Sequence, residues 1–197
     1  MKWSDRFAAM AAALVLGAGL AACAPAAEEG PPLPPETMTQ DPEVPAPVKL
    51  PAKVTATRDE ILAYAKRGSL SGLARFADRN DGFVSNLEGT PNREFWDLLR
   101  RTGIDPNMKL QALLDQPAGK RDVDGETWYI WPDLAAKNPE DLIPEKLSFQ
   151  DRKRLTDLIG EDGVAAIREG QAYPGMRTAI TQSGRWVYFV LGSDGEE

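Results

Sequence analysis

The sequence predicts one α+β domain over residues 54–197, in which several short helices pack a small sheet made of two antiparallel β-hairpins. Segments with apolar residues at helical spacing come first, and two segments with strand-like alternation follow, each centred on a tight turn. Hairpins imply antiparallel pairing, which is typical of the α+β class. About 144 residues are enough for a single domain with its own core.

The first helices are indicated by start and stop signals. The run from Thr57 to Glu60 has the pattern of a capping box, and Gly68 is the expected stop. Ser69 is a candidate cap for a second helix. The apolar positions that follow these starts are Ile61, Leu62 and Ala65 in the first helix, and Leu70, Leu73, Ala74 and Ala77 in the second.

Two further helices are predicted to start at Thr90-Pro91 and Asp105-Pro106, where a capping residue precedes a proline at the first helical position. Gly103 and Pro117 are their expected stops. Their apolar residues are Phe95, Trp96, Leu98 and Leu99 in the first, and Met108, Leu110, Leu113 and Leu114 in the second.

A hairpin of residues 120–123 and 126–131 is predicted around Asp124-Gly125, because Asp-Gly suits the positive φ angles of a type I′ turn. A second hairpin joins residues 177–181 and 185–191.

Between the hairpins, Asn138-Pro139 is expected to start a short helix. Ser148 is expected to cap a longer helix that is interrupted between Gly160 and Gly163.

Aromatic residues of the two hairpins form the candidate binding surface. By the period-two rule, Trp128 and Ile130 share one face of their strand, and Tyr129 and Trp131 share the other. The same rule places Trp186 and Tyr188 together, opposite Val187 and Phe189. Exposed tryptophan and tyrosine side chains suit sugar rings or protein hot spots. The candidates are Trp128, Trp131, Trp186 and Tyr188, and the alternative is that helices cover both faces and these side chains are core.

Composition narrows the chemistry. The chain has no histidine and a single cysteine, Cys23, which excludes a Ser-His-Asp triad, a histidine-ligated metal and an internal disulfide. Its net charge of −7 argues against nucleic acid as a partner. We therefore predict no cofactor, no metal site and no catalytic residue, and a protein that is not an enzyme.

Two chemical alternatives remain open. Asp81, Gly82 and Glu88 fit three positions of a calcium loop, but Ala77 and Arg79 occupy positions that need oxygen ligands, so a solvated turn is expected. The acid pairs Glu140-Asp141 and Glu161-Asp162 offer carboxylates for a glycan hydrolase, although their spacing defines no catalytic pair.

Residues 1–22 have the parts of an export signal: a start with Lys2 and Arg6, an apolar run from Phe7 to Leu20, and a small-residue end. That run, about 21 Å long as a helix, is too short for a hydrocarbon core of roughly 30 Å. Leu20, Ala21, Ala22 and Cys23 resemble the lipobox of bacterial lipoproteins. The resemblance implies cleavage before Cys23 and lipidation of its thiol. Export with cleavage after Ala24 is the alternative.

Ala24 stands where many lipoproteins retained at the inner membrane have aspartate. The resemblance therefore implies an outer-membrane anchor facing the periplasm, with the inner membrane as the alternative. Residues 23–53 are expected to form a disordered tether, because nine of the 30 residues after Cys23 are proline and several others are acidic.

The mature domain resembles small uncharacterised envelope proteins of Gram-negative bacteria. The stretches that carry the resemblance are residues 96–103, residues 128–134, Tyr173-Pro174-Gly175 and Gly184-Arg185-Trp186. It implies an envelope location and no activity. We expect a non-catalytic binding or scaffolding protein, anchored to the membrane by lipid, whose partner is an envelope protein or peptidoglycan. The alternatives are a carboxylate-based cell-wall hydrolase and a carrier of a small apolar ligand.

Overall fold

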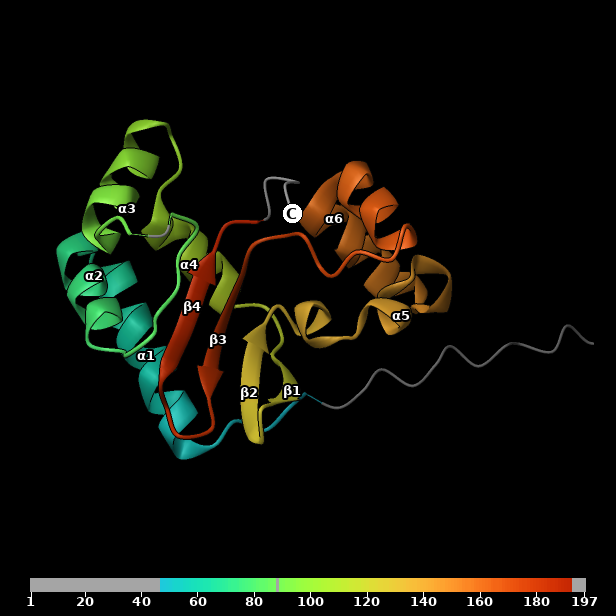
Figure 1. Ribbon diagram of the computed structural model, residues 1–197, viewed down its shortest axis with the longest axis horizontal. Helices are drawn as coiled ribbons and strands as arrows, with labels where there is room; N and C mark the ends of the chain where they lie inside the picture. Colours follow the sequence, from blue (N-terminus) through green and yellow to red (C-terminus); the bar gives the residue numbers. More distant parts are fainter. Residues whose placement is uncertain (1–46, 88, 193–197) are drawn as a thin grey trace, which may run out of the picture. The chain divides into compact units, whose positions relative to one another are not determined.

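The computed structural model describes residues 47–87 and 89–192, so the predicted export signal, the lipobox-like run and most of the expected tether lie outside the described residues. Helices, a hairpin, helices and a second hairpin follow one another as predicted (Figure 1). The elements are α1 (Ala52–Lys66), α2 (Leu70–Asp78), α3 (Asn92–Arg101), α4 (Pro106–Leu114), β1 (Gly119–Val123), β2 (Glu126–Trp131), the 3-10 helix η1 (Asp133–Ala136), α5 (Pro139–Leu142), the 3-10 helix η2 (Pro144–Lys146), α6 (Phe149–Arg168), β3 (Arg177–Thr181) and β4 (Trp186–Val190).

The two hairpins join into one antiparallel sheet with the strand order β1-β2-β3-β4. This arrangement confirms the predicted α+β class. The turn between β1 and β2 has φ of 50° at Asp124 and 81° at Gly125, as expected for a tight hairpin turn. Trp128 and Trp131 of β2 pair with Thr181 and Thr178 of β3, which makes β2 and β3 the central strands.

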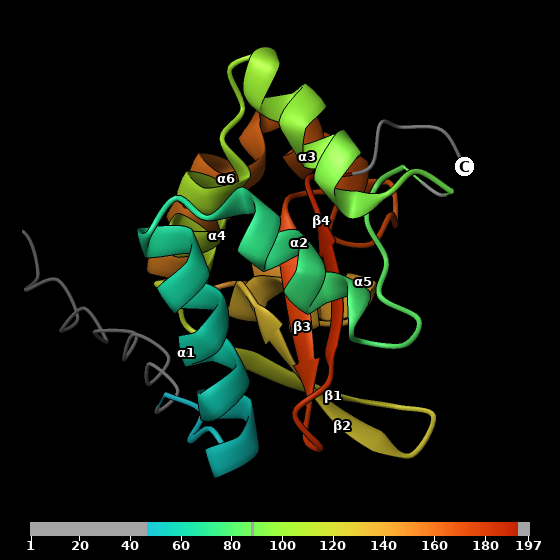
Figure 2. The same cartoon turned by 90° about the vertical axis from the view of Figure 1, so that its left-hand side faces the viewer.

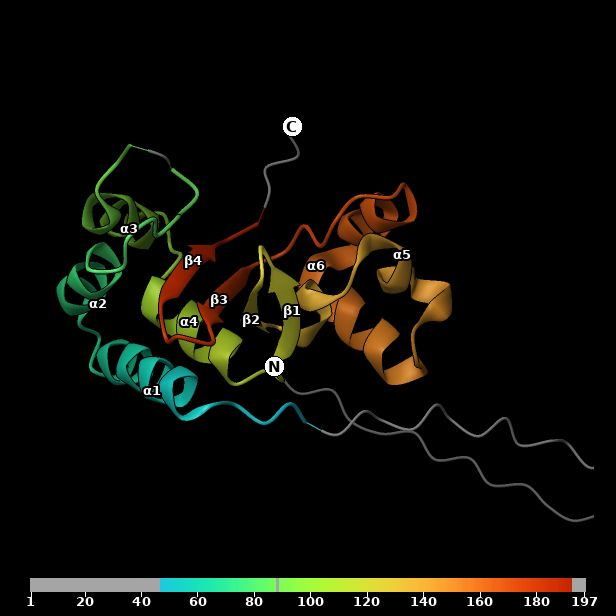
Figure 3. The same ribbon diagram turned by 60° about the horizontal axis from the view of Figure 1, so that its bottom comes forward.

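Helices cover both faces of the sheet. Helices α1 to α4 lie on one face and bury a core that includes Trp96, Trp131 and Trp186. Figure 2 views this helical layer from its outer side, and Figure 3 shows α5 and α6 on the opposite face. The second core lies between that face and α6, with Ile130, Ala179 and Leu155 among its buried residues. Each face of the sheet is therefore at least partly covered by helices.

The start of α1 differs from the prediction. The helix begins at Ala52, and Thr57 lies inside it, where its hydroxyl donates a hydrogen bond of 2.6 Å to the carbonyl oxygen of Gly184. Val48 and Leu50 pack against the first core, so the folded domain begins before Val54. The prediction of a capping box was wrong, because the Thr57 hydroxyl bonds to the β3–β4 turn and does not cap a helix end.

Other local signals agree with the structure. The Asp105 carboxylate accepts from the Asn107 N–H at 2.9 Å, and the Ser148 hydroxyl accepts from the Asp151 N–H at 3.1 Å, so both residues cap their helices. Gly160, with φ of 69°, interrupts α6 within the predicted segment. The start predicted at Thr90 was wrong by a short distance, since α3 begins at Asn92 with Pro91 as its capping position.

A β-bulge changes the faces of β4. Ile180 pairs with Trp186 and Ala179 pairs with Tyr188, which leaves Val187 as an extra residue. Trp186 and Phe189 consequently both face α1 to α4, whereas Tyr188 faces the α6 side. The prediction that Trp186 and Tyr188 share a face was wrong, because one inserted residue reverses the alternation along the rest of the strand.

The outer edge of β4 is covered by the segment that links α2 to α3. Val84 accepts from the Phe189 N–H and donates to the Val187 carbonyl oxygen, at 3.0 Å in each case. The Asn80 side chain accepts from the Trp186 N–H, and the Asn86 side chain accepts from the Leu191 N–H. Residues 80–86 therefore form hydrogen bonds with main-chain groups that an edge strand would otherwise expose.

Candidate functional site

Two of the four predicted surface aromatics are core residues. Trp131 is 1% exposed and Trp186 is not exposed at all. The Trp186 indole N–H donates to the Thr178 hydroxyl at 2.8 Å, and its ring lies 5.9 Å from that of Phe76. The prediction that these two tryptophans form a binding surface was wrong, since α1 to α4 cover the face to which they belong.

Trp128 and Tyr188 remain as a half-buried pair on the other face. Their ring centroids lie 6.2 Å apart with the planes tilted by 56°. Both rings pack at the margin of the second core. In the described part of the chain, neither the Trp128 indole N–H nor the Tyr188 hydroxyl has a hydrogen-bond partner, and both polar atoms retain some exposure to solvent. The pair thus keeps polar groups available to a ligand.

Two arginines flank this pair. Arg121 of β1 is the direct cross-strand neighbour of Trp128. Arg177 lies two residues before Ala179 on β3, and Ala179 pairs with Tyr188. Arg121 donates to the carbonyl oxygens of Ala136 and Lys137, and Arg177 donates to that of Gly175. Neither guanidinium forms an ion pair within the described residues. Each retains N–H groups without a partner there.

We call Arg121, Trp128, Arg177 and Tyr188 the aromatic–arginine patch. One residue comes from each strand of the sheet, so the patch exists only in the assembled sheet. Burial raises the pKa of the Tyr188 hydroxyl, and the positive charges of Arg177 and Arg121 partly oppose that rise. The phenol is therefore a neutral hydrogen-bond donor at neutral pH, beside two fixed positive charges on a protein with net charge −7.

A second polar cluster joins η1 to α6. Arg154 contacts Asp133 at 2.6 Å and Asp151 at 2.9 Å. Burial opposes the Arg154 charge, but the hydrogen bonds and charges of the two aspartates outweigh burial and raise its pKa. Because both carboxylates contact this arginine, the cluster fastens α6 to η1.

Tyr173 lies near this cluster, and the raised pKa of its buried hydroxyl predicts that the domain loses stability at alkaline pH. Burial raises its pKa to about 12, above the value near 10 of an unfolded tyrosine. As the pH rises, the unfolded chain therefore loses the Tyr173 proton before the folded chain does. The contribution of this hydroxyl to the free energy of unfolding is complete below pH 10 and is lost between about pH 10 and pH 12. Two pKa units correspond to at most about 2.7 kcal/mol. Chemical denaturation at several pH values should show this decline, and Tyr173→Phe should reduce it. An equally steep decline in Tyr173→Phe would contradict the assignment.

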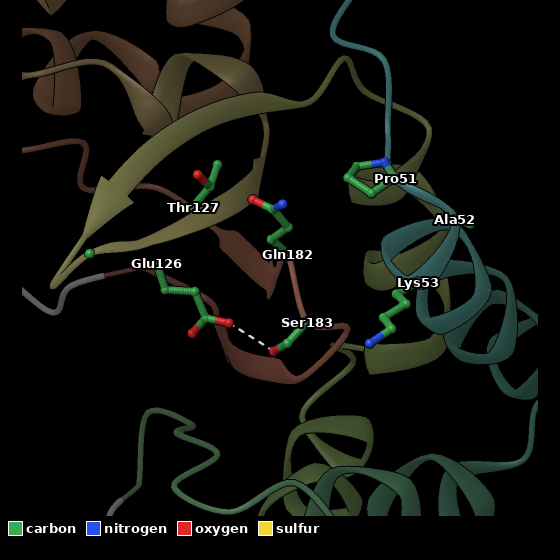
Figure 4. A pocket seen from close by; sticks show the side chains of 8 residues that line it. Pro51, Ala52, Lys53, Glu126, Thr127, Gln182 and Ser183 are labelled. Atoms are coloured by element: carbon green, nitrogen blue, oxygen red, sulfur yellow. Dashed lines mark hydrogen bonds between the residues drawn. The ribbon is translucent and has the colours of Figure 1, made fainter.

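A hollow of about 530 Å³ lies between the start of α1 and the two hairpin turns, lined by Lys53, Glu126, Gln182, Ser183 and their neighbours (Figure 4). The Ser183 hydroxyl donates to Glu126 at 2.7 Å, and this bond is the main cause of the lowered pKa of Glu126. Among the described residues of the lining, Glu126 is the single carboxylate. The described lining therefore does not supply the two opposed carboxylates that a glycan hydrolase uses.

A second hollow, of about 480 Å³, lies between the α3–α4 connection and the broken part of α6. Ile104, Leu158, Ile159, Met176 and Leu191 contribute its apolar lining, and Lys109 its charge. All five apolar residues are half-buried, so the hollow opens at the surface. It differs from the enclosed cavity expected of a carrier for a small apolar ligand.

None of the acidic residues predicted as alternatives is among the described residues that line these hollows. Glu140, Asp141, Glu161 and Asp162 are all exposed to solvent. Asp81 and Gly82 form a turn, in which Gly82 has φ of 70° and the Asp81 carbonyl accepts from Arg185. Glu88, the last proposed calcium ligand, lies outside the described residues. Within residues 47–87 and 89–192, no group of three acidic, histidine or cysteine side chains could hold a metal.

Sequence reasoning found Trp128 and Tyr188 but missed the two arginines. The Asp124-Gly125 turn sets the β1–β2 register, so it could have placed Arg121 beside Trp128. Arg177 joins them only through the β2–β3 pairing, for which the sequence carries no local signal. Comparison of the chain with protein-family models, curated proteins and solved structures finds no match.

Proposed function

We propose that this chain is a lipid-anchored protein of the bacterial envelope whose folded domain binds a partner and performs no catalysis. Support for the anchor is the lipobox-like run Leu20-Ala21-Ala22-Cys23 behind an export signal. Ala24 after the cysteine favours the outer membrane, facing the periplasm. Within the described residues, no helix combines the length and apolarity needed to cross a bilayer.

The tether supports a role at a distance from the membrane. Residues 24–46, which precede the folded domain, reach up to about 70 Å if extended as polyproline II, at about 3.1 Å per residue. Repulsion between the acidic side chains of this segment favours such extension. The domain is then able to meet a partner that does not itself contact the membrane surface.

The aromatic–arginine patch is the observation that carries the binding proposal. Trp128 and Tyr188 offer rigid rings for apolar faces, and such faces occur on sugars. Arg121 and Arg177 offer guanidinium N–H groups that match carboxylates. A polymer that combines sugar rings with carboxylates meets both requirements. We therefore propose the cell wall, whose peptidoglycan carries both groups, as the partner.

The test is co-sedimentation of the purified full chain, in detergent, with cell-wall sacculi. We expect the wild-type protein to pellet, and we expect Trp128→Ala and Arg177→Gln each to reduce the bound fraction roughly tenfold or more, as is typical of hot-spot residues. Matched controls are Phe149→Ala and Arg75→Gln, because both residues are exposed and lie outside the patch.

The result separates the alternatives. Loss of pelleting in the patch variants but not in the controls supports the proposal. Equal pelleting of all variants would place the binding elsewhere, and no pelleting would leave an envelope protein as the partner. Release of soluble wall fragments would contradict the non-catalytic role and would favour a hydrolase.

A further inference from the structure

The two edge strands of the sheet, β4 and β1, differ in the hydrogen bonds that their outward main-chain groups make with other segments. At β4, Asn80, Val84 and Asn86 bind the outward main-chain groups. At β1, in the described part of the chain, no hydrogen bond joins the main chain of Gly119–Val123 to any segment other than β2. An open edge is a template for another strand.

The register of the first hairpin shows which groups β1 presents. In a two-residue hairpin, the residues that flank the turn exchange both hydrogen bonds, and hydrogen-bonded pairs then alternate along the strand. Val123, Arg121 and Gly119 therefore bond to β2. The N–H and C=O groups of Lys120 and Asp122 point away from the sheet, and both side chains are exposed.

We propose that the open edge of β1 pairs with β1 of a second copy of this chain, in antiparallel orientation about a two-fold axis at Arg121. Lys120 then lies opposite Asp122 of the partner subunit, and Asp122 opposite the partner's Lys120. Both are hydrogen-bonded pairs, so four main-chain hydrogen bonds form across the axis. The same pairing places opposite charges next to each other twice, which stabilises an antiparallel register.

Arg121 is compatible with this arrangement. In this register it lies opposite the partner's Arg121, and like charges in that position are unfavourable. Its guanidinium is directed instead to the carbonyl oxygens of Ala136 and Lys137, which belong to its own subunit. Each guanidinium thus has acceptors within its own subunit.

The chain's own tether is a poor occupant of this edge. Proline lacks the N–H that a strand must donate, and residues 24–53 contain nine prolines. A second copy, in contrast, brings a complementary Lys–Asp pattern.

The dimer is expected to be weak in solution. Two five-residue strands bury much less than the roughly 1,200 Å² found at the lower limit of stable interfaces. Confinement on a membrane raises the effective concentration, a step that rests on the proposed lipid anchor.

The charges provide the first test. With Cys23→Ser in all proteins, to remove the native thiol and the anchor, sedimentation equilibrium at increasing concentration measures dimerisation. Lys120→Asp and Asp122→Lys should each weaken the dimer roughly tenfold, because both pairs become repulsive. The double swap Lys120→Asp/Asp122→Lys should restore it. Lys120→Pro, which removes an outward N–H that an edge strand does not need, should abolish it without unfolding the domain.

A disulfide test checks the register, and it also works in membranes with Cys23 intact. Co-expressed Lys120→Cys and Asp122→Cys copies should form a disulfide-linked dimer, since directly opposite residues are about 5.5 Å apart. Either variant alone should not, because its two cysteines would lie diagonally, about 7–8 Å apart.

The proposal would be overturned by a monomer at every concentration and in the membrane, by equal cross-linking of the single variants, or by a double swap as weak as its parents. Peptides that bind β1 of a monomeric protein would also overturn it. All these results are independent of wall binding, so failure here is distinguishable from failure of the proposed function.

Discussion

Cys23→Ser is expected to transfer nearly all of the protein from the membrane fraction to the soluble periplasmic fraction. Each buried methylene of an acyl chain contributes about 0.8 kcal/mol, so several chains hold the protein firmly whereas one chain holds it only marginally. Serine lacks the thiol that the proposed lipidation requires. Cell fractionation with immunodetection measures the transfer, and incorporation of labelled palmitate measures the modification.

Thr37→Ala is a suitable control, because it changes the tether and leaves the cysteine intact. The control should remain in the membrane fraction and should incorporate the label. A Cys23→Ser protein that still sediments with membranes and resists high salt would contradict the anchor, and residues 1–22 would then require another interpretation.

Trp186→Ala is expected to destabilise the domain by roughly 3–5 kcal/mol. Its side chain is fully buried, and its ring contacts Phe83 at 4.6 Å between centroids as well as Phe76 and Trp96. The substitution leaves a cavity. It also removes the indole N–H that donates a hydrogen bond to the buried Thr178 hydroxyl. Urea denaturation followed by circular dichroism measures the free energy of unfolding.

Two comparisons make this prediction specific. Phe149→Ala should change the free energy of unfolding by at most about 0.5 kcal/mol, because Phe149 is 73% exposed. Trp186→Phe keeps most of the volume and should fold even if Trp186→Ala does not. A loss in Trp186→Ala no larger than that in Phe149→Ala would show that Trp186 is not the core residue described above.

The order of the elements was predictable because its signals are local. Asp124-Gly125 defines a hairpin turn, Asp105 and Ser148 cap helices through their own neighbours, and Gly160 takes a left-handed conformation that other residues avoid. Each of these effects acts within a few residues. They are therefore visible in a sequence without knowledge of the rest of the fold.

Local patterns failed where a distant segment determined the outcome. Thr57 has the sequence context of a cap, but its hydroxyl bonds to Gly184, which is 127 residues away in the chain. The bulge at Val187 placed Trp186 and Tyr188 on opposite faces. Which aromatic residues are exposed also depends on the helices that cover each face, and the alternation along a strand carries no information about those helices.

The sequence by itself determined the class of fold and the classes of chemistry that a chain without histidine excludes. It is also the sole basis for the proposed export signal and lipid anchor. The tertiary structure alone decided the composition of the binding patch and the difference between the two sheet edges. Arg121, Trp128, Arg177 and Tyr188 come from four strands, and the β4 edge is covered by a segment that begins before α3. Contacts of this kind depend on long-range strand pairing and packing, which are properties of the folded chain as a whole.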